Sequence, residues 1–390
     1  MNNLLNMNDP DYLLTTIFGE SNQQAFVAIS PGRVNLIGGH TDYNEGFVLP
    51  AAIGQYVNVA ARPRTDKTVA AYSEEYDEIR EFSLEDADPD AKGSWIDYVE
   101  GVCTQLAQDH ALRGAEFVVR SDLPSGAGLS SSAALELAVA AAVDRMNDLE
   151  CSNRTLARHC WRAENEFVGV NCGIMDQYAV ALSAENSALF LDCRDEAVEH
   201  IPFPAETVNA VVINTTVTHE LVESAYNERR AQCERGVALF DRCLDREVTS
   251  LRDISIDDFE AYQERLPAPV RERCEHVVYE NRRVQRAVDA LREGEIETVG
   301  DLMYDSHASL RDLYEVSCEE LDVAVDVART QDDVLGARMT GAGFGGSVIG
   351  LVRAQNSGDA VNAIRREFRS RTDVDPQVAV YSLVKGVQAN

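Results

Sequence analysis

The pattern of hydrophobic and polar positions divides the chain into strand-like and helix-like stretches. Alternating apolar runs predict strands over residues 56–61, 116–120, 208–213 and 378–384. Apolar residues at helical spacing predict helices over residues 132–148, 153–167, 219–244, 274–294 and 315–330. Because these elements mix without a strict alternation of strand and helix, the pattern favours an α+β fold over a doubly wound parallel sheet.

The clearest predicted helix follows a loop rich in glycine and serine. From Leu135 its apolar positions fall on one helical face, and Ser130–Ser132 are natural N-caps for it. In the preceding run, residues 123–134, glycines allow a close backbone approach, and the helix N-terminus attracts anions. We therefore expect a polyphosphate here. The plainer alternative is a glycine turn that only leads into a buried helix.

Two further segments also place glycines next to a short apolar run, residues 30–50 and residues 338–352. The first is preceded by a strand-like run at residues 25–29, which leads into a turn, and the other is a glycine loop followed by a strand-like run. None of the three is a Walker A motif, because none of the chain's three lysines, Lys67, Lys92 and Lys385, lies near a glycine cluster. The loop at residues 341–346 also lacks the spacing of a dinucleotide-binding fingerprint.

The three segments, in this order, resemble the GHMP small-molecule kinases and, within them, the galactokinases. The run Pro31–Gly38 followed by His40–Asn44 resembles the first galactokinase motif, and Cys172–Gln177 resembles the catalytic segment. Agreement extends from about residue 25 to the C-terminus. The resemblance implies a two-lobed α+β GHMP kinase fold, with an S5-like N-terminal lobe, a ferredoxin-like C-terminal lobe and the active site between them. We expect the lobes to span residues 1–205 and 206–390.

The resemblance also implies an activity, the ATP-dependent phosphorylation of the anomeric hydroxyl of galactose, and the residues that carry it. Asp176 is the expected base and Arg33 its partner. The sugar-binding residues implied are Gly39, His40, Asp42, Asp176, Tyr226 and Gly343. The ATP-binding residues implied are Trp95, which could instead be a packing aromatic, and Gly126, Ala127, Gly128, Leu129, Ser130, Ser131 and Ser132. Ser132 and Glu164 are the implied Mg²⁺ ligands, and the protein is expected to be a monomer.

One position departs from the galactokinase pattern. Gly39 stands where the family has a glutamate that contacts the hydroxyl on the sixth carbon of the sugar. Its absence removes an acceptor and opens space, so L-arabinose and galacturonate stay open beside galactose, and N-acetylgalactosamine is a more remote alternative. A non-catalytic sugar sensor is a different class of protein, but the intact run at residues 130–134 and the presence of Asp176 favour an enzyme.

Composition and charge indicate the cellular environment of the protein. The 390 residues carry a net charge of −31, from 66 acidic and 35 basic residues. This excess predicts a salt-rich cytoplasm, the alternative being an ordinary acidic protein from a GC-rich genome. Nine scattered cysteines without a Cys-x-x-Cys pair indicate reduced thiols, as in a cytosol. No stretch of 18 apolar residues or signal-peptide pattern appears, and the acidic balance argues against nucleic-acid binding.

Overall fold

The computed structural model describes residues 10–86, 91–124, 126–218 and 222–390 and contains three β-sheets. The largest has six strands in the order β13-β1-β3-β6-β4-β5. Its strands are β1 (Phe26–Asn35), β3 (Pro50–Pro63), β4 (Thr68–Ser73), β5 (Glu78–Ser83), β6 (Ala115–Ser121) and β13 (Gln388–Ala389). All neighbouring strands run antiparallel except β4 and β6, which are parallel.

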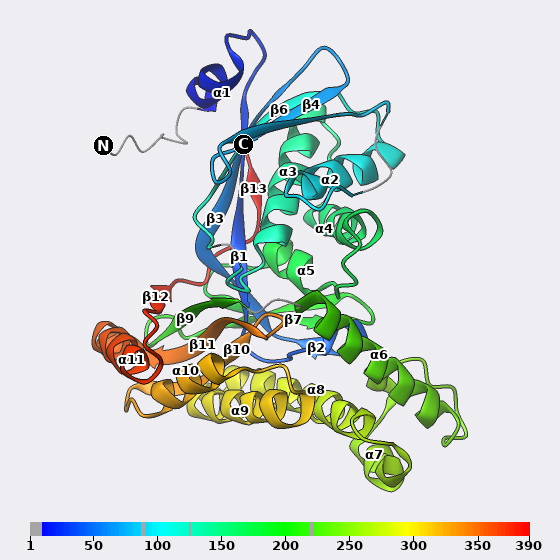
Figure 1. The fold of residues 1–390 in the computed structure, drawn as a ribbon, viewed down its shortest axis with the longest axis vertical. Coiled ribbons are helices and arrows are strands. Elements are labelled where there is room, and N and C mark those ends of the chain that lie inside the picture. The colour runs from blue at the N-terminus through cyan, green and yellow to red at the C-terminus, as the bar shows by residue number, and fades with distance from the viewer. Residues whose placement is uncertain (1–9, 87–90, 125, 219–221) are drawn as a thin grey trace.

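Helices cover both faces of this sheet. In Figure 1 the sheet stands upright, and one face is lined by α2 (Ile96–Asp109), α3 (Ser131–Asn147), α4 (Asn153–Arg162) and α5 (Met175–Leu182). The opposite face packs against α1 (Pro10–Phe18) through Leu14, Ala60 and Val118. Helix α3 is buried on nearly all sides, whereas the sequence pattern predicts one apolar face. Its run of alanines explains the difference, since small side chains let the sheet and the neighbouring helices approach from several directions.

The second sheet has four antiparallel strands in the order β10-β11-β9-β12 and lies across the lower end of the first in Figure 1. Its strands are β9 (Val208–Thr218), β10 (Val334–Thr340), β11 (Gly345–Arg353) and β12 (Gln377–Tyr381). The helices of this half of the chain are α6 (Val222–Asp241), α7 (Ile256–Tyr262), α8 (Val270–Glu293), α9 (Ile296–Ser309), α10 (Glu319–Arg329) and α11 (Ser357–Thr372). Together the two sheets and their helices form the mixed α+β fold that the sequence pattern predicts, in the two-lobed arrangement that the family resemblance implies.

The predicted division of the chain at residue 205 stays a prediction. Strand β9 opens the second sheet at Val208, but β13, at the end of the chain, returns to pair with β1. Val208, Ala210 and Val212 also belong to the same hydrophobic core as β1 and β3. The two lobes therefore share packed surface and are tied together at the C-terminus.

The first glycine-containing segment differs from its prediction. The sequence suggests a turn after residue 29, but β1 continues to Asn35 with a bulge between Pro31 and Gly32. The bulge fits the sequence, because a Cβ at Gly32 would lie 2.4 Å from a methyl carbon of Leu123. The extended strand carries Arg33 to the end of the sheet where the lobes meet.

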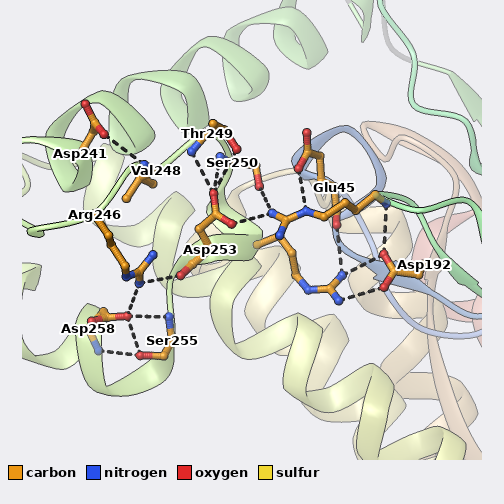
Figure 2. Close-up of polar contacts among 12 residues, drawn as sticks. Glu45, Asp192, Asp241, Arg246, Val248, Thr249, Ser250, Asp253, Ser255 and Asp258 are labelled. Atoms are coloured by element: carbon orange, nitrogen blue, oxygen red, sulfur yellow. Dashed lines mark hydrogen bonds and ion pairs between the residues drawn. The ribbon is translucent and has the colours of Figure 1, made fainter.

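A third, small sheet joins the lobes near the end of this segment. It contains β2 (Phe47–Val48), β7 (Ser187–Asp192) and β8 (Ala197–Pro202). Arg252 lies between α6 and α7, among the helices of the second half of the chain (called here the helical half), and donates to both carboxylate oxygens of Asp192 at 3.1 and 2.9 Å. Arg194, which follows β7, in turn donates to the side chains of Glu45 and Asp253 at 2.9 and 2.8 Å (Figure 2). These reciprocal pairs fasten the small sheet to the helical half.

Candidate active site

A cavity of about 300 Å³ lies where the three glycine-containing segments meet. Most residues predicted for the site line it: Arg33, His40, Asp42, Gly126, Gly128, Leu129, Ser130, Ser131, Ser132, Glu164, Asp176 and Tyr226. The wall also includes residues that the sequence analysis did not select: Gly169, Val170, Asn171, Cys172, Gly173, Met175, Asn227, Gly341 and Ala342. Segments more than 200 residues apart in the chain therefore form one chamber.

Asp176 stands in the first turn of α5 and is held by Arg33. Arg33 donates from Nε to Oδ1 and from Nη2 to Oδ2, both at 2.7 Å, which is a bidentate pair. The arginine side chain is 5% exposed, whereas that of the aspartate is 27% exposed toward the cavity. A carboxylate that is fixed from behind and open in front is suited to accept a proton from a bound molecule.

Ser130 supplies a third hydrogen bond to the same carboxylate. Its backbone is left-handed, with φ of 60° and ψ of 49°, and its hydroxyl donates to Asp176 Oδ2 at 2.5 Å. Ser130 occupies the N-cap position of α3, as the sequence predicts, and its carbonyl accepts from the amide of Ala134, but its hydroxyl makes no capping hydrogen bond to the described helix residues. An N-cap side chain needs an extended backbone, which Ser130 does not have.

The glycine-rich loop before α3 has a backbone conformation that favours glycine. Gly126 and Gly128 have φ of 71° and 72°, a region that favours glycine. The first amides of α3 have no partner within the helix, and its first residues, Ser131 and Ser132, face the cavity. The loop is braced from the second lobe, since Ser347 donates to the carbonyl of Ala127 at 2.7 Å.

His40 links the first glycine-containing segment to the third. Its Nε2 lies 3.1 Å from the carbonyl of Ala342 and its Nδ1 lies 2.8 Å from the hydroxyl of Tyr43. Because a carbonyl only accepts, Nε2 carries the proton and Nδ1 accepts from the tyrosine. Burial and the nearby His276 lower the pKa of His40 to about 3, so the ring is neutral. A sugar hydroxyl could bond this ring only by replacing one of its two partners.

Asp42 depends on a glycine that sequence reasoning did not select. A Cβ at Gly173 would lie 2.0 Å from Asp42 Oδ2, so only glycine leaves room for the carboxylate. The signal was present in the sequence, since Gly173 belongs to the quoted run 172–177. Burial and the charge of Asp176 raise the pKa of Asp42 to about 6. The ring of Tyr226, from α6, lies 5.6 Å from the ring of His40 and completes this wall.

Glu164 is a buried carboxylate on the wall beside the glycine-rich loop. It lies in a π-helical turn, residues 163–168, and accepts hydrogen bonds from the side chains of Ser132 and Gln177. Burial and the charge of Asp176 raise its pKa. Within the described residues, no group of three or more histidines, cysteines or acidic residues could hold a metal ion. Two protein oxygens, from Ser132 and Glu164, nevertheless suit Mg²⁺, which keeps most of its coordination for water and phosphate.

Four described residues predicted for the site stand outside the cavity wall. Gly39 is buried behind it, donating to Glu280 Oε1 at 3.2 Å and accepting from His276. Gly343 packs on Val316, whose carbonyl oxygen would lie 2.2 Å from a Cβ at that glycine. The remaining two are Ala127, which is bound to Ser347, and Trp95.

Trp95 matches the packing alternative for this residue. Its indole nitrogen donates to Glu78 at 2.9 Å, and its ring is nearly parallel to that of Tyr76, with centroids 6.2 Å apart. Its side chain is partly buried and packs against the hydrophobic core that β1, β3 and α3 share. Its predicted contact with adenine stays a prediction.

Comparisons with known proteins show which family the chain resembles over most of its length. Residues 97–184 match the GHMP kinases N terminal domain, residues 14–63 match the galactokinase galactose-binding signature, and residues 287–372 match the GHMP kinases C terminal domain. A galactokinase of Chloroflexus aggregans is 43% identical over 362 residues, covering 93% of this chain and 92% of its own. A galactokinase of a Roseiflexus species is 44% identical over 83% of this chain and 82% of its own.

Solved structures agree on the fold. The crystal structure of Lactococcus lactis galactokinase complexed with galactose has a TM-score of 0.93 at 35% identity, covering 98% of this chain and 99% of that one. The Methanococcus jannaschii mevalonate kinase shares the fold, with a TM-score of 0.65 at 16% identity over 94% of this chain and all of the other. With matches of this identity and coverage, the chain belongs to the galactokinase family of the GHMP kinases.

Proposed function

We propose that this chain transfers the terminal phosphoryl group of ATP to the anomeric hydroxyl of galactose, with Asp176 as the base. The observation that carries the proposal is the position of Arg33. Its guanidinium holds Asp176 on one side and donates from Nη1 to the carbonyl of Gly128, in the glycine-rich loop, at 2.7 Å on the other. The base thus stands between the segment proposed to hold the sugar and the loop proposed to hold the phosphates.

In this proposal the residues bind and orient the reactants, and one proton moves. Asp42, His40 and Tyr226 surround the sugar, and the amides of the loop at residues 126–132 hold the phosphates. The anomeric oxygen attacks the terminal phosphorus, the bond from that phosphorus to the bridging oxygen of ADP breaks, and the hydroxyl proton passes to Asp176. Because phosphoryl transfer needs mainly positioning and charge stabilisation, a fixed Arg33 close to the transferring group contributes directly.

We also propose that Ser132 and Glu164 hold Mg²⁺. The ion, when bound, neutralises charge on the phosphates of the nucleotide. In a chain of net charge −31 that neutralisation matters, because an acidic protein otherwise repels ATP. Glu164 is a carboxylate held among acidic neighbours, which is the environment that a cation stabilises.

Galactose is the sugar that the site supports best. A side chain at position 39 would start 2.5 Å from Arg338 Nη2 and 3.2 Å from Leu310. The room expected from the missing glutamate is therefore taken by the protein, which disfavours the bulkier carboxylate of galacturonate. L-Arabinose, which lacks the sixth carbon, stays the second candidate because Gly39 offers no acceptor for that hydroxyl.

One assay tests these proposals together. Release of ADP is measured with galactose, L-arabinose, galacturonate, glucose and N-acetylgalactosamine in parallel, with and without Mg²⁺. We expect the highest kcat/KM with galactose and no turnover without a divalent ion. A higher kcat/KM with L-arabinose would overturn the choice of sugar, and turnover in excess chelator would overturn the metal.

The setting of the protein is proposed on composition. We expect a reducing, salt-rich cytoplasm, since all nine cysteines are free thiols and acidic residues outnumber basic ones by 66 to 35. That the protein is a monomer is proposed on the family resemblance alone. No helix of the described residues combines the length and the apolar character needed to cross a membrane. Thermal unfolding at rising KCl concentration tests the salt proposal, and a melting temperature independent of KCl would contradict it.

A further inference from the structure

Two buried polar residues stand directly behind the cavity and take no part in the chemistry proposed so far. Glu136 follows Ser132 by one turn of α3, and Gln177 follows Asp176 on α5. Both side chains are completely buried, and neither is part of the cavity wall that the described residues form. Glu136 is thus one helical turn from Ser132, and Gln177 is next to Asp176, and both of these neighbours are proposed to act on the substrates.

The amide nitrogen of Gln177 bridges two carboxylates. It donates to Glu164 Oε2 at 2.5 Å and to Glu136 Oε2 at 3.1 Å, which uses both of its hydrogens. Only one of these carboxylates, Glu164, reaches the cavity. Gln177 therefore connects the carboxylate on the wall to a second carboxylate in the interior.

This arrangement is unfavourable as packing alone. Within the described residues, Oε1 of Gln177 and Oε1 of Glu136 are buried without a hydrogen-bond partner. Each such atom costs about 1–3 kcal/mol relative to a satisfied one. Burial and the charge of Glu164 also raise the pKa of Glu136 well above its usual range. A stable core would be built more simply from apolar side chains, so the cluster suggests a functional reason.

Charge indicates what that reason is. Glu136, Glu164 and Asp176 lie close enough to influence one another, and among the described ion pairs the only cation for the three is Arg33, on Asp176. Glu164 thus faces the cavity without a basic partner from the described chain, held by neutral donors. A carboxylate kept in this way can bind a cation that arrives with the nucleotide.

We propose that Gln177 and Glu136 are positioning residues for Glu164, which they hold in the orientation that binds the divalent ion. This inference rests on the proposed function of Glu164. The amide of Gln177 restrains Oε2 of the ligand, and the carboxylate of Glu136 restrains the amide in turn. Since Gln177 directly follows Asp176 on α5, one helical turn sets both the base and the metal ligand. Replacing a residue that hydrogen-bonds to a metal ligand typically weakens metal affinity by about 10- to 100-fold.

The chain offers a matched control. Gln105 is also a buried glutamine that donates to a carboxylate, Glu166 Oε2, at 3.0 Å, and its Oε1 is likewise without a partner among the described residues. It lies on α2 in the same lobe and stands apart from the cavity wall. Because Glu166 lies in the same π-helical turn as Glu164, Gln105→Leu removes the same kind of hydrogen bond from that turn without removing a contact to Glu164 itself.

The test compares Gln177→Leu and Glu136→Gln with Gln105→Leu and the unmodified chain. Binding of Mn²⁺ to the complex with ADP is measured without turnover, and the Mg²⁺ concentration for half-maximal rate is measured with galactose and ATP. We expect Gln177→Leu to weaken both by tenfold or more and Glu136→Gln to weaken both to a smaller extent, with KM for galactose within twofold of the unmodified value. Gln105→Leu should leave both metal measurements unchanged.

Each outcome bears on a defined proposal. If Gln177→Leu binds Mn²⁺ and depends on Mg²⁺ as the unmodified chain does, the inference is overturned. An equal loss of metal affinity in Gln105→Leu would overturn it as well. If Gln177→Leu does not fold, Glu136→Gln decides, because it keeps the side-chain volume, and an unchanged metal affinity would then overturn the inference. The proposed function is tested separately by the unmodified chain, in which absence of galactose phosphorylation or of Mn²⁺ binding would refute it before any variant is made.

Discussion

Arg33 and Asp176 form a bidentate pair in which two hydrogen bonds of 2.7 Å run parallel, Nε to Oδ1 and Nη2 to Oδ2. The third nitrogen of the same guanidinium reaches the carbonyl of Gly128. Only arginine has the planar fork that makes all three contacts at once, because a lysine ammonium is a single point of charge. The pair therefore ties the base to the glycine-rich loop.

Removal of either member should abolish turnover and leave the fold intact. Asp176→Asn keeps the shape of the side chain but cannot take up the proton, so we expect kcat to fall by about 10²–10⁴. Arg33→Lys keeps the charge but loses the fork, and we expect a loss of similar order. Glu116→Gln is the control, since Glu116 pairs with Arg62 on the same sheet away from the cavity. Turnover near normal in Asp176→Asn would remove this residue from the mechanism.

Much of the site could be predicted from the sequence because its residues lie in contiguous motifs. The two glycine-rich loops and the run with Asp176 each appear as one uninterrupted segment, and the structure brings them to one cavity. The order of these segments along the chain carries the prediction through their resemblance to the galactokinase motifs, since a glycine- and serine-rich loop alone can also be a plain turn before a helix.

What the sequence did not predict depends on contacts between distant segments. The local sequence predicts helix capping for the side chain of Ser130, because its neighbours form a helix, but the partner of its hydroxyl is Asp176, 46 residues away. Likewise, the space beside Gly39 is filled by Arg338 from β10, which no local pattern could indicate. The continuation of β1 beyond residue 29 is also set by pairing with β3, which overrides the local turn signal of Pro31 and Gly32.

Sugar binding should depend on pH through Asp42. Burial and the charge of Asp176 raise the pKa of Asp42 to about 6, so the group gains a proton as the pH falls through 6. The protonated acid has less capacity to accept hydrogen bonds from hydroxyls. We therefore expect the affinity for galactose, measured by calorimetry, to be full above pH 7 and to weaken below pH 6.

Two variants identify the titrating group. Asp42→Asn should bind galactose weakly, with no pH dependence between pH 5 and 7. Asp176→Asn should move the transition to lower pH, because it removes a negative charge that raises the pKa of Asp42. A transition unchanged in Asp42→Asn would assign the pH dependence to another group.

Gly173 should be intolerant of any side chain. In Gly173→Ala the new Cβ would lie 2.0 Å from Oδ2 and 2.3 Å from Cγ of Asp42, so the carboxylate has to move. We expect KM for galactose to rise at least tenfold while KM for ATP stays within twofold. Gly54→Ala is the control, since its Cβ would have no neighbour closer than 3.7 Å. Unchanged sugar kinetics in Gly173→Ala would show that Asp42 is not a sugar contact.

Arg252 should hold the segment that carries His40 and Asp42 from outside the cavity. It donates to the carbonyl of Glu45 at 3.1 Å and to Asp192, and its guanidinium lies 3.4 Å from the ring centre of Phe47. Hydrogen bonds to charged groups contribute about 1.5–3 kcal/mol, so Arg252→Ala should lower the free energy of unfolding by that order. KM for galactose should rise more than kcat falls, because the sugar segment loses an anchor while the base does not.

A neighbouring arginine provides the control for this last prediction. Arg246 donates at 2.7 Å to the carbonyl of Asp253 and to the carboxylate of Asp258, and both acidic residues appear beside it in Figure 2. Since these partners lie within the helical half, Arg246→Ala should cost about 0–1 kcal/mol and leave KM for galactose unchanged. Urea unfolding and steady-state kinetics of the two variants separate the effects. An equal rise in KM in both would mean that stability, and not the anchoring of the sugar segment, controls sugar binding.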